Sequence, residues 1–188
     1  MQSEDAPNAK KSLRSQLSEA RQTLAKDPET ASMLAAQLNQ LATSLQAKTV
    51  AAYLPFGTEP NIMDFVAGAA GRGITLVMPV SQLDQSMHWV EYTGLSAPGI
   101  FGFHEPTGIE ASLESAELIL IPASAADQQG NRLGKGKGFY DIALAQLANR
   151  IPVAAVVYDQ EVLEQLPIEA HDQAVDYVVT PKRTIAVG

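Results

Sequence analysis

The segment Arg132–Asp141 (RLGKGKGFYD) has the residue types and spacing of an anion-binding loop. Its glycines alternate with Lys135 and Lys137, and Arg132 lies just upstream. Glycine lets the backbone approach a ligand closely and adopt positive φ, and successive backbone N–H groups in such turns form concavities that bind anions. The apolar residues that follow are spaced as in a helix, whose N-terminus favours phosphate. The segment is therefore predicted to hold a polyphosphate.

Two well-known phosphate-binding patterns do not match this segment. Its spacing is G-x-G-x-G rather than the G-x-G-x-x-G of dinucleotide-binding folds, and it is not a P-loop because Lys137 is followed by Gly138. The alternative is a flexible, solvated basic loop. A ligand site is favoured because the loop is short, lies between a predicted strand and a predicted helix, and ends in Phe139–Asp141 rather than in polar residues.

Several carboxylates are candidates for contacts with a metal or a substrate. Mg²⁺ prefers oxygen ligands and takes one or two protein carboxylates. Asp141 is the first candidate, although an acid in the first turn of a helix also stabilises the helix dipole. Asp127 can equally shape its turn, and the position of Asp172 by itself indicates only a surface residue. Glu59 can accept a hydrogen bond from a ring N–H of a substrate, or it can simply belong to a turn.

The charge distribution narrows the class of ligand. The net charge of −8 argues against a nucleic-acid partner or an anionic membrane surface. The 13 lysines and arginines are nevertheless unevenly placed, with one group at Lys10–Arg14, another at Arg132–Lys137, and none between Arg72 and Arg132. This concentration indicates an anionic ligand. For Lys10–Arg14 the alternative is the solvent-exposed face of a helix.

Composition also limits the compartment and the chemistry. The 188 residues, 46% of them hydrophobic, are enough for one domain with a substantial core. The absence of cysteine excludes a disulfide framework and thiolate chemistry. Residues 1–8 lack a signal-peptide core, and no apolar run approaches the ~20 residues of a membrane span. A cytoplasmic protein is expected, and no G-x-S-x-G nucleophile motif occurs.

Hydrophobic periodicity predicts an α/β protein. Residues 1–8 are expected to be disordered and residues 9–188 to form a single domain. Helices are predicted at about Lys10–Lys26, from Pro28 to about Gln46 with Asp27 as N-cap, at Ile62–Ala70 with Asn61 as cap, and at Phe139–Asn149. Strands are predicted at Thr49–Leu54, Ile74–Met78 (ended by Pro79), Met87–Tyr92 (at the sheet edge), Leu118–Ile121, Val153–Tyr158 and Tyr177–Val179. The segments Thr93–Thr107 and Pro122–Lys137 are predicted to be loops.

This order of elements favours a central, mostly parallel sheet with helices on both faces and an N-terminal helical pair. In such folds ligands bind beyond the carboxyl ends of the strands. We call the glycines and lysines of Gly134–Gly138 the Gly/Lys loop. The loop after Thr49–Leu54, which carries Glu59, and the Gly/Lys loop, which comes after Leu118–Ile121, should therefore open at the same edge of the sheet.

Taken together, these motifs resemble the 5-formyltetrahydrofolate cyclo-ligase family, also called methenyltetrahydrofolate synthetase. The resemblance runs from Lys10 to Thr180 in the order of the family's motifs, and the RLGKGKGFYD segment is its most specific part. The other matching pieces are Lys10–Arg14, Tyr53–Pro55 with Glu59, Met78–Val80, Gly102–Pro106, Ile121–Pro122, Asp127, Gly130, Leu166–Pro167, His171–Asp172 and Val178–Thr180.

The resemblance implies an α/β fold and a specific reaction. The family couples ATP hydrolysis to the closure of 5-formyltetrahydrofolate into 5,10-methenyltetrahydrofolate, with release of ADP and phosphate. The implied steps are phosphorylation of the formyl oxygen, attack by N10 of the folate, and loss of phosphate. A polyphosphate loop beside a pterin site suits this chemistry because the formyl oxygen is a poor leaving group until it is phosphorylated.

The resemblance also implies roles for individual residues, with Lys137 and Arg132 expected to be catalytic. The expected ATP contacts are Lys10, Lys11, Arg14, Arg132, Leu133, Gly134, Lys135, Gly136, Lys137, Gly138, Phe139 and Tyr140. The expected folate contacts are Leu54, Glu59, Lys135, Gly136, Lys137, Gly138 and Phe139. Asp141 and Asp172 are expected to hold Mg²⁺. A monomer with ATP and 5-formyltetrahydrofolate as its ligands is expected, without nucleic-acid or membrane partners.

The chain departs from the family pattern at a few positions. Phe139 replaces the commoner tyrosine, Ile142 stands where arginine is frequent, Pro60 stands where isoleucine is common, and Ser124–Ala126 is smaller than the usual apolar run. None of these removes a matched phosphate or metal ligand. Two other functions are considered: another ATP-dependent kinase or ligase for a small molecule, and a non-catalytic module that binds nucleotide or folate.

Overall fold

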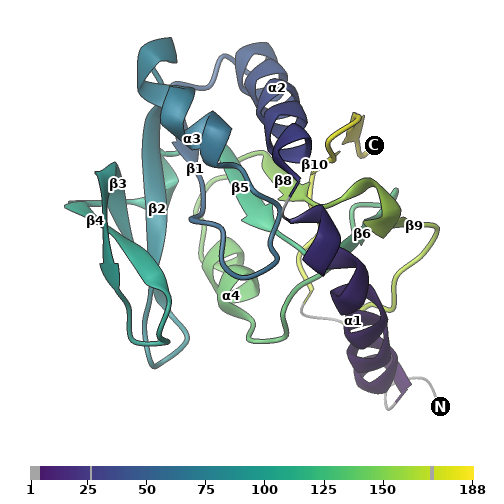
Figure 1. Ribbon diagram of the computed structural model, residues 1–188. Helices are drawn as coiled ribbons and strands as arrows, with labels where there is room; N and C mark the ends of the chain where they lie inside the picture. Colours follow the sequence, from purple (N-terminus) through teal and green to yellow (C-terminus); the bar gives the residue numbers. More distant parts are fainter. Residues whose placement is uncertain (1–4, 26, 170–171) are drawn as a thin grey trace.

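An eight-stranded mixed sheet forms the centre of the structure, a computed structural model that describes residues 5–25, 27–169 and 172–188 (Figure 1). Its strand order is β11-β10-β8-β5-β1-β2-β3-β4. The strands are β1 (Thr49–Ala51), β2 (Thr75–Ser81), β3 (Met87–Pro98), β4 (His104–Ala111), β5 (Leu118–Pro122), β8 (Val153–Val156), β10 (Tyr177–Val179) and β11 (Thr184–Ala186).

The five central strands are parallel, and the chain changes direction across the sheet between β1 and β5. β1 pairs with β2 on one side and with β5 on the other, and β8 and β10 continue outward from β5. The chain therefore runs one way from β1 and the opposite way from β5. In open α/β sheets the ligand crevice lies at this point, beyond the carboxyl ends of the strands.

The outer strands make the sheet mixed, and they correct two predictions. The segment Thr93–Thr107 is not a loop, because β3 extends to Pro98 and pairs antiparallel with β4. A bulge between Tyr92 and Leu95, with Gly94 at φ +91°, bends this hairpin. The edge strand is therefore β4 rather than the predicted Met87–Tyr92, and an edge tolerates prolines such as Pro106.

The prediction that Pro79 ends its strand is also wrong. β2 continues through Pro79 to Ser81 and pairs antiparallel with β3 there, with Pro79 opposite Trp89. Its other neighbour, β1, has already ended, since the last pair of that ladder joins Ala51 to Val77. Proline lacks only the N–H that would face this unpaired side, so the strand continues at no loss of a ladder hydrogen bond.

Helices cover both faces of the sheet, as predicted. The helices are α1 (Asp5–Leu24), α2 (Pro28–Ser44), α3 (Met63–Ala69) and α4 (Phe139–Ala145). One apolar cluster joins α2 and α3 to the sheet through buried residues such as Leu38 and Phe65. A second cluster joins α4 to the opposite face through Tyr140 and Leu144. In the described part of the chain no helix is long and apolar enough to cross a bilayer.

The helix ends follow local rules with some differences from prediction. Asp27 caps α2 as predicted, accepting a hydrogen bond from the Glu29 N–H at 3.0 Å. α1 begins at Asp5, so it includes part of the segment predicted to be disordered; Pro7 lies in the first turn, where its missing N–H has no partner to lose. Residues 1–4 and Lys26 lie outside the described residues.

α4 ends at Ala145 rather than at the predicted Asn149. The N–H groups of Gln146 and Leu147 bond to carbonyls three residues back, at Ala143 and Leu144, which tightens the last turn and ends the helix. Short 3₁₀ turns occur at Ala70–Arg72, Leu113–Ser115 and Asp159–Glu161.

A small second sheet replaces much of the predicted loop Pro122–Lys137. It is built from β6 (Ala125–Asp127), β7 (Arg132–Leu133) and β9 (Val162–Leu163). The fully buried carboxylate of Asp127 accepts hydrogen bonds from the backbone N–H groups of Gln129, Asn131 and Leu166. Asp127 therefore shapes this turn, one of the two roles considered for it.

A buried ion pair attaches α1 to the rest of the protein. Arg21 is 5% exposed and Glu161 2% exposed, and the Arg21 Nη2 atom lies 2.7 Å from Glu161 Oε2. Arg21 also donates to the carbonyl of Ala123 and lies over the ring of Tyr158, 5.6 Å from its centroid. The apolar contacts of α1 are smaller, with Leu13 and Leu17 only partly buried. The position of α1 therefore depends strongly on Arg21.

We predict that Arg21→Met lowers the free energy of unfolding by about 3–5 kcal/mol, because it leaves the Glu161 carboxylate buried without its partner. The double variant Arg21→Met/Glu161→Leu should recover a large part of that loss, since it removes the uncompensated charge. Urea denaturation followed by circular dichroism measures both. A single variant as stable as the unchanged protein would contradict the anchoring role.

Candidate active site

A cavity of about 590 Å³ opens at the carboxyl edge of the parallel strands. It is lined by the loop after β1, the segment between β7 and α4, the tip of the β3–β4 hairpin and one face of α1. Figure 1 shows the hairpin on one side and α1 on the other, with the β1–α3 loop and α4 between them. The Glu59 loop and the Gly/Lys loop thus meet at one edge, as the order of elements predicts.

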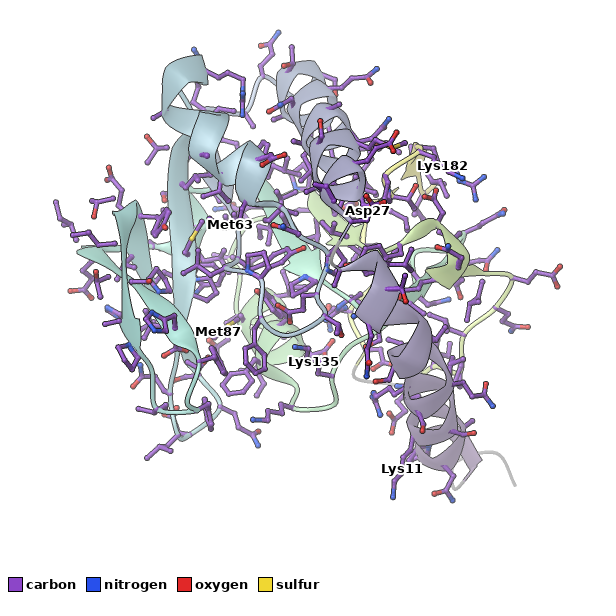
Figure 2. The ribbon with its side chains drawn as sticks, viewed as in Figure 1. Lys11, Asp27, Met63, Met87, Lys135 and Lys182 are labelled. Carbon is purple, nitrogen blue, oxygen red and sulfur yellow. The ribbon has the colours of Figure 1, made fainter. Side chains whose placement is uncertain are left out.

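All but one of the predicted site residues line this cavity. They are Lys10, Arg14, Leu54, Glu59, Arg132, Leu133, Gly134, Lys135, Gly136, Lys137, Gly138, Phe139, Tyr140, Asp141 and Asp172. The exception is Lys11, whose side chain is exposed and points away at the outer part of α1 in Figure 2. Lys10 and Arg14, one turn apart, line the cavity, and Lys11, about 100° around the helix from Lys10, lies outside this face.

The cations of α1 that do reach the cavity are bound to two other segments. Lys10 Nζ lies 2.6 Å from Asp172 Oδ2 and 2.7 Å from Glu169 Oε2. Burial by itself lowers the pKa of Lys10, but the hydrogen bonds that its ammonium donates to Asp172 and Glu169, and the negative charges of these carboxylates, outweigh burial and raise the pKa. Arg14 Nε donates to the carbonyl of Gly134 at 2.7 Å. One face of α1 therefore presents two positive charges beside the Gly/Lys loop.

Two glycines of the Gly/Lys loop adopt conformations that other residues avoid. Gly136 has φ +88° and Gly138 φ +74°, in the left-handed region that favours glycine. Gly136 also lies close to α1, since a Cβ there would be 3.4 Å from the Arg14 guanidinium. Glycine at these positions lets the backbone turn toward the cavity while Lys135 and Lys137 alternate along it.

The two predicted metal ligands lie in neighbouring segments. Asp141 Oδ1 accepts from Arg132 Nη2 at 2.6 Å and from the N–H of Gln173, the residue after Asp172, at 3.2 Å. Asp172 Oδ2 accepts from Lys10 and from the N–H of Glu169. Both carboxylates line the cavity. Within the described ranges no group of three or more His, Cys, Asp or Glu residues is arranged to hold a metal.

Arg132 is buried and has specific partners. Besides Asp141, its guanidinium donates to the carbonyl of Gln173. It therefore joins the start of α4 to the segment that contains Asp172. This geometry gives Arg132 a role in placing Asp141, in addition to the positive charge that it contributes to the cavity wall.

Glu59 and Lys135 form an ion pair across the cavity. Lys135 Nζ lies 2.7 Å from Glu59 Oε1, and the other Glu59 oxygen accepts from the N–H of Phe56 at 2.8 Å. The side chain of Glu59 is 10% exposed, whereas that of Lys135 is 50% exposed. Figure 2 shows Lys135 in the centre of the molecule, between the hairpin and α1. The carboxylate is thus largely buried and held by two donors, whereas its cation is half exposed to solvent.

Tyr158 connects the Glu59 loop to the anchor of α1. Its hydroxyl donates to the carbonyl of Glu59 at 3.3 Å. Burial raises the pKa of Tyr158 to about 12, although the Arg21 guanidinium opposes this shift. The hydroxyl therefore stays protonated at neutral pH. Sequence patterns do not indicate this residue, because the contact joins segments far apart in the chain.

An aromatic wall, composed of Phe56, Phe101, Phe103 and Phe139, lines the same cavity. The ring centroids of Phe56 and Phe103 are 4.6 Å apart, and those of Phe101 and Phe139 are 5.9 Å apart. Of the five phenylalanines in the chain, only Phe65 belongs to the core instead. Phe56, Phe101 and Phe103 were not predicted as site residues. Two phenylalanines flanking a glycine at Phe101–Phe103 are the sequence signal that could have indicated them.

The aromatic wall also contacts the lysines of the Gly/Lys loop. Lys137 Nζ lies 4.3 Å from the Phe101 ring centroid, and Lys135 Nζ lies 4.8 Å from that of Phe56. A cation over an aromatic face is attracted by the ring quadrupole. The first contact links the Gly/Lys loop to the tip of the β3–β4 hairpin, and the second links it to the loop after β1.

Glu105 fixes the tip of the hairpin. It is 5% exposed and accepts a hydrogen bond from the N–H of Ser81 at 2.8 Å. Gly99 packs so closely on it that a Cβ there would collide with the Glu105 carboxylate. Glu105 therefore joins β4 to the end of β2 and holds Phe101 and Phe103 over the cavity.

Tyr140 is the second residue of α4 and lines the cavity. Burial, assisted by the negative charge of Glu59, raises its pKa far above the ordinary value, while Arg132 opposes the shift. Its hydroxyl is therefore a neutral hydrogen-bond donor throughout the physiological range. This property suits an anionic ligand and would not be supplied by the neighbouring Phe139.

Comparisons with known proteins agree on the family of this chain. The model of the 5-formyltetrahydrofolate cyclo-ligase family matches residues 6–181. A protein of Mycolicibacterium smegmatis named 5-formyltetrahydrofolate cyclo-ligase is 37% identical over 150 residues, which cover 75% of this chain and 77% of that protein. The human methenyltetrahydrofolate synthase domain-containing protein is 31% identical over 102 residues, which cover 50% of this chain and 26% of that protein.

Solved structures show the same fold. The 5,10-methenyltetrahydrofolate synthetase of Aquifex aeolicus superposes with a TM-score of 0.80 at 27% identity and covers 95% of this chain and 92% of its own. The enzyme of the same name from Mycoplasma pneumoniae superposes with a TM-score of 0.70 at 22% identity, covering 90% and 97% respectively.

Proposed function

The chain belongs to the 5-formyltetrahydrofolate cyclo-ligase family, and on this basis we propose that it converts 5-formyltetrahydrofolate into 5,10-methenyltetrahydrofolate with ATP and Mg²⁺. The observation that carries the proposal is a single cavity with two different walls. One side of the cavity is formed by the Gly/Lys loop and the cations of α1. The other side is formed by Glu59 and the phenylalanines of the aromatic wall. A reaction that transfers a phosphoryl group from ATP to a folate needs both.

The chemistry proceeds in two steps. The formyl oxygen attacks the γ-phosphorus of ATP, the bond from that phosphorus to the β–γ bridging oxygen breaks, and ADP leaves. N10 of the folate then attacks the activated formyl carbon and loses its proton, and the bond from that carbon to the phosphorylated oxygen breaks to release phosphate. Preorganised cations lower the barrier because negative charge develops on the transferring group.

The residues of the cavity divide between the two substrates in this proposal. Lys10 and Arg14 on α1, together with the backbone of the Gly/Lys loop, bind the phosphates. Lys137 neutralises the transferring phosphoryl group, and Tyr140 donates a hydrogen bond to it. Glu59 accepts hydrogen bonds from the folate ring, while Leu54 and the aromatic wall provide apolar contact.

The carboxylate pair Asp141 and Asp172 fits Mg²⁺. The ion usually takes one or two protein carboxylates and fills its other positions with waters and substrate phosphates, so a larger protein cluster is not needed. Both residues line the cavity from adjoining segments, where Asp141 accepts from Arg132 and Asp172 accepts from Lys10. When bound, Mg²⁺ would offset the charge of the phosphates.

A second candidate function, a non-catalytic nucleotide- or folate-binding module, is less well supported. The chain retains Lys137, Glu59 and Asp141 together in one cavity, and a pure binding module needs no paired arrangement of phosphate and ring contacts. A different ATP-dependent kinase or ligase would share the side of the cavity proposed to bind the phosphates, but not the side proposed to bind the folate. The expectation of a cytoplasmic monomer stays a prediction.

The proposed reaction is tested by mixing the protein with Mg–ATP and 5-formyltetrahydrofolate and following the near-ultraviolet absorbance of the methenyl product. Product should form at the same rate as ADP, and only when nucleotide, Mg²⁺ and folate are all present. Nucleotide and folate binding without product would favour the binding module. ADP release with a different amide or acid, but not with this folate, would favour another ligase.

We predict that Lys137→Ala lowers kcat by about a hundredfold or more, the magnitude typical of losing one preorganised charge at a transition state. The KM values for both substrates should change much less. Lys48→Ala, which removes an exposed lysine far from the cavity, is the matched control and should leave kcat unchanged. Equal kcat for the Lys137 and Lys48 variants would show that Lys137 is only surface charge.

We predict that Asp141→Asn raises the Mg²⁺ concentration needed for half-maximal activity by about tenfold or more, because an amide is a weaker ligand for a hard cation than a carboxylate. Asp64→Asn, at an exposed aspartate in the first turn of α3, is the control. Activity is titrated with Mg²⁺ at fixed ATP. An Mg²⁺ titration of the Asp141 variant that coincides with the control would reject the ligand role.

A further inference from the structure

The ion pair between Lys135 and Glu59 joins the two walls of the cavity. Lys135 belongs to the loop assigned above to the phosphates, and Glu59 belongs to the loop assigned to the folate ring. Their side chains meet with Nζ 2.7 Å from Oε1. The two residues are far apart in the chain, with β2, β3, β4 and β5 between them. A change at one substrate site can therefore reach the other through a single contact.

Glu59 depends on this ammonium. Its side chain is only 10% exposed, and among the described residues its cationic partner within ion-pair distance is Lys135. The Glu59 Oε2 atom is already engaged by the N–H of Phe56. Removing the partner from a buried carboxylate is strongly unfavourable unless other donors replace it.

Lys135 can move at much lower cost. Half of its side chain is exposed, and its other nearby contact is the face of the Phe56 ring, with Nζ 4.8 Å from the centroid. Its neighbour Gly136 adopts a left-handed conformation and Gly134 has no atom within contact distance of an added Cβ. A flexible four-carbon stem between glycines can redirect the ammonium within the cavity.

A phosphate group and Glu59 compete for this one ammonium. A phosphate oxygen carries more charge than a carboxylate oxygen and accepts strong charge-assisted hydrogen bonds. We propose that Lys135 couples the two substrates: ATP draws its ammonium away from Glu59, and the freed carboxylate then accepts hydrogen bonds from the folate ring. This inference rests on the proposed function, because it takes ATP and 5-formyltetrahydrofolate as the ligands of the two walls.

The coupling has a definite sign. Once Lys135 has turned to the phosphates, the Oε1 atom of Glu59 has lost its donor while Oε2 keeps the N–H of Phe56. The folate ring supplies a new donor to Oε1, so the nucleotide increases the affinity for folate. Thermodynamic linkage requires that folate increases the affinity for the nucleotide by the same factor. Lys135 is thus a positioning residue: when ATP is present, it leaves the Glu59 carboxylate free to bind the folate ring. When ATP is absent, Lys135 occupies Glu59 and weakens the binding of folate.

The experiment measures binding of 5-formyltetrahydrofolate by calorimetry with and without a Mg²⁺ complex of an ATP analogue whose β–γ bridging oxygen is replaced by NH. The analogue is held at saturation for each variant, as fixed by its own titration. In the unchanged protein the analogue should lower the Kd for folate by about tenfold, within the usual range of coupling between sites. The reciprocal titration should give the same factor.

Three variants test whether Lys135 carries the coupling. In Lys135→Met the factor by which the analogue lowers the folate Kd should fall to about twofold or less. Lys135→Arg should keep the full factor, because guanidinium also pairs with both carboxylate and phosphate. Lys182→Met is the matched control, since Lys182 is exposed and lies away from the cavity (Figure 2). It should behave like the unchanged protein.

Two results would overturn the inference. One is an unchanged protein whose folate Kd is the same with and without the analogue. The other is a Lys135→Met protein that retains the full effect. If either occurs in a protein that forms methenyl product with Mg–ATP, the coupling fails while the proposed function stands. A protein that neither binds folate nor forms product would overturn both.

Discussion

The parallel pairing of β1 with β5 is the constraint on which the site depends. Val50 and Ala51 pair with Leu118 and Ile119, and all four are almost completely buried. Because the chain leaves β1 toward one side of the sheet and β5 toward the other, the two following loops separate at this point and leave room for a ligand between them. The α3 and α4 helices that follow these loops pack on opposite faces, which keeps the two walls of the cavity apart.

Ion pairs hold the parts of the site that the sheet does not. The α1 helix has few buried apolar contacts, and its Arg21 is paired inside the protein with Glu161. Toward the cavity the same helix face places Lys10 against Asp172. The buried pair is a permanent anchor, because separating it leaves an uncompensated charge. Lys10 is buried as well, but Lys135, whose side chain is 50% exposed, is screened by solvent and can exchange partners at lower cost, which a site for two substrates requires.

Much of the fold and the family follows from the sequence. The resemblance drawn from RLGKGKGFYD is confirmed by the family model, and apolar runs such as Leu118–Ile121 mark buried parallel strands because such strands are covered on both faces. The β3–β4 hairpin was missed, because glycines and prolines in Thr93–Thr107 suggest a loop. Gly94 forms a bulge and Pro106 occupies an edge strand, and both are compatible with a strand only when its neighbours are known. Phe101 and Phe103 of the aromatic wall are missed for the same reason, because this hairpin carries them, whereas Phe139 is among the predicted site residues.

The sequence by itself determined the kinds of groups in the site, since glycines, lysines and carboxylates at these spacings already indicate a polyphosphate and a metal. It also placed the two ligand loops at one edge, because parallel strands present their carboxyl ends together. Only the tertiary structure decided which partner each charge has. Lys10 and Lys11 are adjacent in sequence, yet only Lys10 reaches Asp172, since the helix turns by about 100° between them. Lys135 meets Glu59 for a related reason: ion pairs across a cavity depend on the packing of distant elements, which no local pattern encodes.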